Sequence, residues 1–119
     1  MSDEFLILAT AEINNEITEI QNILNSCHDS LDISKNVVNF QKSTHKIKGL
    51  APMMGKPELG NFSSILDSIL KKIIDGAVLN NLSELISSAV TEMKNSMVYP
   101  DYNLDKPKQH FLQISHTLS

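Results

Sequence analysis

Apolar residues recur at steps of three and four along most of the chain, a spacing that predicts amphipathic helices. The stretches with this pattern cover residues 3–26, 35–54, 57–74 and 81–97. In the second stretch the step connects Val37, Phe40, Thr44, Ile47, Ala51 and Met54. No stretch alternates apolar and polar residues in the manner of a strand, so the pattern predicts an all-α fold.

Polar and helix-breaking residues separate these stretches. Residues 27–34 are mostly polar, and Ser34 is the expected N-cap of the second helix. Pro57 suits the first turn of the third helix, and the dipeptide "DG" ends that helix. Because the connections are short, we expect the four helices to be antiparallel neighbours in an up-and-down four-helix bundle.

The pattern changes after Met97. The segment "VYPDYNLDKP" contains two prolines and predicts a connection. Beyond it Phe111, Ile114 and Leu118 share one helical face, so we expect a short fifth C-terminal helix that folds back on the bundle. The 119 residues thus form one unit, with the bundle over residues 1–97 and the connection and fifth helix over 98–119.

Composition and charge exclude several classes of partner. The formal net charge of -4 argues against nucleic acid, which needs concentrated positive charge. The chain has ten lysines and no arginine, so phosphate contacts must come from ammonium groups or backbone amides. Three features predict a cytoplasmic protein without a membrane partner. The chain has a single cysteine, it starts with acidic residues in place of a basic leader, and it has no apolar run of membrane length.

One histidine of the second helix lies within the sequence "STHKIKG". At about 100° per residue, His45 falls away from the core stripe through Thr44 and Ile47, onto an exposed flank. Lys48 adjoins the ring by the three-residue spacing, and Gly49 leaves a gap beside it by the four-residue spacing. Glycine costs a helix interior roughly 1 kcal/mol relative to alanine, so the gap suggests that another group needs room. A neutral ring nitrogen beside an ammonium group suits a phosphoryl acceptor.

The sequence "HKIKG", followed by "APMMG", resembles the motif of histidine-containing phosphotransfer (HPt) domains. In that motif a histidine is followed by two residues, a lysine and a glycine, and a further glycine ends the helix. The resemblance extends over residues 5–97. Within the family, the chain is most similar to the phosphotransfer domain of chemotaxis histidine kinases of the CheA type. The features that favour this subgroup are the isoleucine of the motif, the "MMG" and a location at the N-terminus. A fifth helix also suits that subgroup.

This resemblance implies that His45 accepts a phosphoryl group from an ATP-bound histidine kinase domain and passes it to an aspartate of a response regulator receiver domain. Lys48 would stabilise the phosphoryl group, and Gly49 would give access to the ring. A glutamate of the third helix orients the ring in chemotaxis kinases, and Asp67 is the matching residue. We expect Asp67 on a solvent-facing line that continues to a solvated Lys71. The domain itself would bind no cofactor or metal, since ATP and Mg²⁺ are used by the kinase domain.

Three differences from the family bear on this site. Asp67 is one methylene shorter than glutamate, so its contact with the ring could be lost or bridged by water. Ser64 stands where some chemotaxis kinases carry a second histidine. Pro52 follows where the family has small residues, and it lacks the amide that would bond to the carbonyl of Lys48, so we expect the helix to kink or end there.

Two other interpretations stay open at this stage. The chain could be a free-standing HPt protein of a multistep phosphorelay, which exchanges phosphoryl groups between two receivers. It could also be a non-catalytic helical docking module whose histidine is incidental, because an isolated surface histidine is usually no more than that. In each phosphotransfer interpretation the domain is a phosphoacceptor and carrier, and catalysis belongs to the kinase.

Overall fold

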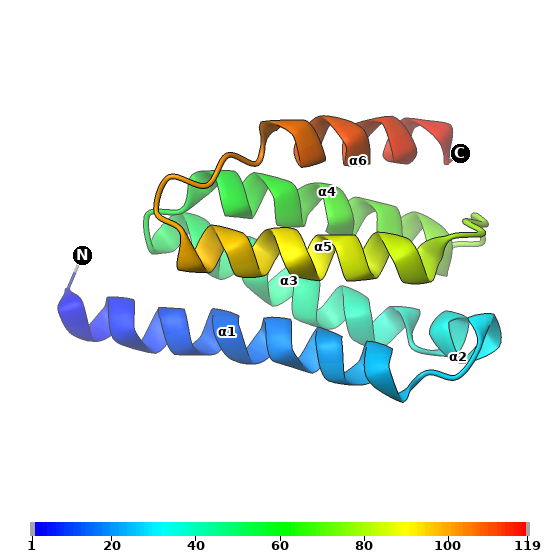
Figure 1. Cartoon of the computed structure of the whole chain (residues 1–119), viewed down its shortest axis with the longest axis horizontal. Coiled ribbons are helices and arrows are strands. Elements are labelled where there is room, and N and C mark those ends of the chain that lie inside the picture. Colours follow the sequence, from blue (N-terminus) through cyan, green and yellow to red (C-terminus); the bar gives the residue numbers. More distant parts are fainter. Residues whose placement is uncertain (1, 119) are drawn as a thin grey trace.

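The structure is a computed structural model that describes residues 2–118 and is helical with no strand over that range. The outer limits predicted for the domain, residues 1 and 119, lie outside the described part. The helices within it are α1 (Asp3–Ser26), α2 (Ser30–Lys35), α3 (Val37–Met53), α4 (Pro57–Ile74), α5 (Leu82–Val98) and α6 (Asp105–Thr117) (Figure 1). None of these helices is long and apolar enough to cross a membrane.

Local sequence signals account for the starts of α1, α2 and α4. Ser2 caps α1 by accepting a hydrogen bond from the backbone N–H of Phe5, and Pro57 is the first residue of α4. The short helix α2 was not predicted, and the expected cap at Ser34 is wrong because that residue lies inside α2. The side chain of Asp29 caps α2 instead, by accepting from the N–H of Asp32 at 2.9 Å.

The long helices pack side by side, with successive ones running in opposite directions (Figure 1). Helix α3 packs against α4 most extensively and also against α1, while α1 packs against α5. Helix α2, which connects α1 to α3 along the chain, packs against α5 and α3. The short turn of residues 54–56 joins α3 to α4, so the two helices that carry the predicted site residues are direct neighbours.

The predicted C-terminal helix is α6, which lies along α4 (Figure 1). Phe111 is buried, and its ring centroid lies 4.8 Å from that of Phe62 on α4. Nζ of Lys72 donates to the backbone carbonyl of Ser115 at 2.7 Å, which holds the last turn of α6. Residues 105–117 therefore pack on the rest of the chain.

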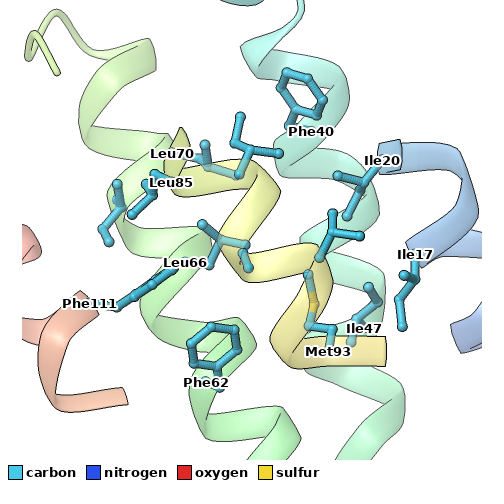
Figure 2. Close-up of a cluster of buried hydrophobic side chains, with 14 of the residues drawn as sticks. Ile17, Ile20, Phe40, Ile47, Phe62, Leu66, Leu70, Leu85, Met93 and Phe111 are labelled. Atoms are coloured by element: carbon cyan, nitrogen blue, oxygen red, sulfur yellow. The ribbon is translucent and has the colours of Figure 1, made fainter. Parts of the chain in front are cut away.

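A single apolar core fills the space between the helices. Figure 2 shows side chains from five helices meeting in it: Ile17, Ile20, Phe40, Ile47, Phe62, Leu66, Leu70, Leu85, Met93 and Phe111. All six core positions predicted for the second helix are buried. Burial of each large apolar side chain contributes about 1.5–3 kcal/mol, so this core fixes the positions of α3 and α4.

Candidate functional site

His45 lies on the exposed side of α3. Its neighbours Thr44 and Ile47 are fully buried, whereas the side chain of His45 is 57% exposed. The helical phase predicts this difference, because the ring is turned about 100° from Thr44. The imidazole is therefore attached to a well-packed helix and open to approach by another molecule.

Asp67 on α4 faces this ring across the α3–α4 interface. Its Oδ2 lies 3.5 Å from Nδ1 of His45, within the range of an ion pair and longer than the roughly 2.7–3.2 Å of an ordinary N–H···O hydrogen bond. The prediction that Asp67 lies on a solvent-facing line is wrong, since the residue is only 1% exposed. Close packing of α3 against α4 covers the side of α4 that carries it. With Nδ1 turned to the carboxylate, Nε2 is the ring nitrogen left for an outside group.

Three further side chains contact the carboxylate of Asp67. Nε2 of Gln41 donates to Oδ1 at 2.8 Å. Nζ of Lys48 and Nζ of Lys71 lie 3.4 Å and 3.2 Å from Oδ2. Both oxygens thus have donors, as a buried charged group requires. Because the ring of His45 contacts the same Oδ2, the two ammonium groups also place positive charge beside the imidazole.

The carboxyl group of Asp67 remains ionised at neutral pH. Burial raises the pKa of Asp67, because it removes water from the charged form. The hydrogen bonds from Gln41 and Lys71, the charge of Lys71 and the contact with His45 together outweigh this effect. The pKa of Asp67 consequently lies below its ordinary value of 3.8. Asp67 is therefore only an acceptor near neutral pH, so its contact favours the form of His45 that carries a hydrogen on Nδ1.

Gly49 lies one turn beyond His45 on the exposed face of α3. A Cβ added at Gly49 would meet no atom within 4 Å, so packing inside the chain does not require glycine there. A helix-interior glycine without a packing role costs stability with no gain to the isolated fold. The space beside the ring is open to a partner, and no neighbouring side chain fills it.

The sequence did not assign Gln41 and Lys71 to the site. Gln41 lies one turn before His45, and Lys71 lies one turn after Asp67. These four-residue spacings were a usable signal, because residues at that spacing are neighbours on a helix surface. Lys71 was expected to be solvated, and its side chain is 52% exposed, but its ammonium group also contacts Asp67. The direction in which these two side chains point depends on how α3 packs on α4. No local sequence pattern predicts this packing.

A scan against protein-family models finds no match, and searches of curated proteins and of solved structures find none at a significant level. Among residues 2–118, no group of three or more histidine, cysteine, aspartate or glutamate side chains is placed to hold a metal ion. The chemistry of this site must therefore be argued from its own geometry. That geometry consists of an exposed imidazole, a buried carboxylate behind it and two ammonium groups on the carboxylate.

Proposed function

We propose that the chain is an HPt domain, in which His45 accepts a phosphoryl group from a histidine kinase domain and donates it to an aspartate of a response regulator receiver domain. The observation that carries the proposal is the contact between Nδ1 of a largely exposed imidazole and the buried carboxylate of Asp67. This arrangement leaves Nε2 as an accessible nucleophile. In this account α1, α3, α4 and α5 form the up-and-down four-helix bundle of the family.

In the first transfer, the lone pair on Nε2 of neutral His45 attacks the γ-phosphorus of ATP held by the kinase domain. The N–P bond forms while the bond from that phosphorus to the bridging oxygen breaks, and ADP leaves with the electron pair. The ring becomes positively charged, because Nδ1 keeps its proton. Asp67 accepts the hydrogen bond from Nδ1 and stabilises the charge as it develops. ATP and Mg²⁺ are bound by the kinase domain.

In the second transfer, a carboxylate of the receiver attacks the phosphorus and the N–P bond breaks. The electron pair returns to Nε2, and the ring is neutral again with its proton on Nδ1. Lys48 offsets negative charge on the transferred group, since its ammonium lies within reach of the oxygen that the ring contacts. Gly49 leaves room for the partner's active site to approach the ring.

Helix α6 supports the chemotaxis type within this family, because a fifth helix after the bundle suits that subgroup. Its burial of Phe111 against Phe62 makes α6 a packed part of the domain. The chain would then be the substrate and carrier domain of a cytoplasmic histidine kinase. Its partners would be the catalytic domain of that kinase and a chemotaxis receiver.

The proposal is tested by incubating the protein with a histidine kinase catalytic core and ATP labelled on the γ-phosphate. Phosphoramidate serves as a second donor that needs no kinase. We expect acid-labile label on the unaltered protein and none on H45Q. The matched control is H28Q, because His28 is also exposed but lies between α1 and α2, away from the site. Acid-labile label that persists in H45Q, or its absence from the unaltered protein with both donors, would refute the proposal.

A further inference from the structure

Gln41 and the other polar neighbours of Asp67 bind different carboxylate oxygens. Gln41 donates to Oδ1, whereas His45, Lys48 and Lys71 all contact Oδ2. The bond from Gln41, at 2.8 Å, is the shortest of these contacts. Helices α3 and α4 lie side by side (Figure 1). Since Gln41 lies on α3 and Asp67 on α4, this bond also links the two helices.

We propose that Gln41 is a positioning residue for His45. By holding Oδ1 of Asp67, it turns Oδ2 toward Nδ1 of the ring and so fixes the tautomer that leaves Nε2 unprotonated. The terminal torsion of an aspartate is broad, so a single strong bond to one oxygen determines where the other oxygen points. The value of this tautomer for phosphoryl transfer rests on the proposed function, but the tautomer itself is a property of the isolated protein.

The chemistry of an amide suits this task. A glutamine donates a hydrogen bond without adding charge, so Lys48 and Lys71 remain the sources of positive charge at Oδ2. A carboxylate at position 41 would repel Asp67 and compete for these ammonium groups. An aliphatic side chain there would leave Oδ1 buried without its donor, which favours rotation of the carboxylate away from the ring.

The test measures the tautomer of His45 directly, by long-range ¹H–¹⁵N NMR of protein labelled with ¹⁵N-histidine. In Q41L we expect the ratio of the Nδ1–H to the Nε2–H form to fall about threefold or more, the effect of losing one hydrogen bond of ordinary strength. Q41E should lower this ratio as well. The control is Q21L, because Gln21 makes a hydrogen bond of the same length to Asn25 on the surface of α1. Q21L should leave the ratio unchanged.

A second comparison separates positioning from general loosening of the fold. If Gln41 acts through Asp67, adding Q41L to D67A should change the tautomer ratio no further than D67A alone. Folding is followed by the ¹H–¹⁵N spectrum of the backbone, and Q41E, which preserves the shape of the side chain, provides the test if Q41L unfolds. An unchanged ratio in a folded Q41L or Q41E protein would overturn the inference, as would an equal effect of Q41L with and without Asp67.

These outcomes are independent of the proposed function. If His45 accepts no phosphoryl group but Q41L shifts the tautomer, the positioning role stands and the proposed function fails. If Q41L leaves both the tautomer and the rate of labelling by phosphoramidate unchanged, the proposed function stands and Gln41 has no positioning role. If the proposed function and the positioning role of Gln41 are both correct, Q41L should slow labelling of His45 by phosphoramidate. The factor should be about that by which Q41L lowers the population of the Nδ1–H form.

Discussion

The ring of Pro52 on α3 lies directly over Gly60 on α4, where any side chain would collide with it. A Cβ added at Gly60 would lie 2.6 Å from Cγ and 2.8 Å from Cδ of Pro52. Gly60 is buried, so this contact is part of the α3–α4 interface. It lies on the same pair of helices that hold His45 and Asp67 opposite each other. Pro52, which differs from the HPt pattern that the chain resembles, is thus accommodated by a glycine on the next helix.

We expect G60A to destabilise the protein by about 1–3 kcal/mol, because the added methyl group overpacks a well-filled interface. The measurement is the free energy of unfolding from urea titration followed by circular dichroism. Combining G60A with P52A should restore most of the lost stability, since the proline ring is the group in collision. A G60A protein as stable as the unaltered one would show that α3 and α4 can separate there at no cost.

Gly49 on the exposed face of α3 should behave in the opposite way to Gly60. We expect G49A to raise the free energy of unfolding by up to about 1 kcal/mol, because alanine is the better helix former and its Cβ meets open space. Under the proposed function, the same substitution should slow phosphorylation of His45 by a kinase core, since the methyl group would occupy the open space beside the ring. A G49A protein that is more stable and fully active would remove Gly49 from the site.

The sequence predicted the long helices well because their boundaries depend on local chemistry. Asp3 and Glu4 favour the start of α1, and Pro57 favours the start of α4. Helix α2 was missed because its six residues are too few to show a period. The exposed position of His45 was also predictable, since it needs only the helical phase and the core stripe of the same helix.

The environment of Asp67 could not be predicted in the same way. Its burial depends on the distance and rotation of α3 relative to α4, which are set by packing of the whole core. The same holds for the amide of Gln41 and the ammonium group of Lys71. The spacings of Gln41 to His45 and of Lys71 to Asp67 are visible in the sequence. That both side chains contact the carboxylate of Asp67 depends on how the two helices pack.

Removal of the charge at Asp67 should change how stability depends on pH. The pKa of Asp67 is lowered on folding, so its ionised form stabilises the native state above the unfolded-state pKa near 3.8, and this contribution is lost as the pH falls through the lower folded-state pKa. We expect D67N to be less stable than the unaltered protein at pH 7 and to approach it as the pH falls below about 4. Urea titrations across this range measure the difference.

The control for that experiment is D101N, which removes the same charge from the exposed connection between α5 and α6. Its difference from the unaltered protein should be small at pH 7. A D67N protein whose deficit in stability stays constant from pH 7 to the acid range would mean that Asp67 gains nothing from ionisation.

D67A should in addition slow phosphorylation of His45 while leaving the fold intact, and an unchanged rate would remove Asp67 from the site.

Helix α6 should contribute to the stability of the whole domain. Phe111 is 1% exposed and its ring packs at a tilt against that of Phe62, so we expect F111A to lower the free energy of unfolding by about 3–5 kcal/mol. The neighbouring Leu112 is 38% exposed, and L112A should change stability by no more than about 0.5 kcal/mol. If F111A unfolded only the C-terminal segment and left the stability of α1–α5 unchanged, α6 would be an accessory to the domain.

The two lysines on Asp67 should differ in function although they contact the same oxygen. Lys48 lies on the helix of His45, three residues away, so its ammonium can follow a phosphoryl group on the ring. Lys71 lies on the helix of Asp67, at the shorter distance of 3.2 Å from its carboxylate, and acts mainly on that group.

We therefore expect K48M to slow phosphorylation of His45 roughly 10-fold or more, the effect of losing a charge-assisted hydrogen bond in the transition state. K71M should change the rate less and should instead raise the pKa of Asp67, because its hydrogen bond and charge both lower that pKa. The rates are measured by labelling with a kinase core, and the pKa of Asp67 is measured by NMR titration of its carboxyl carbon. The control for the loss of one positive charge is K94M, on the exposed side of α5. Equal rates for K48M and K94M would mean that the ammonium of Lys48 serves Asp67 alone, and the phosphoryl group would then need its positive charge from the partner's active site.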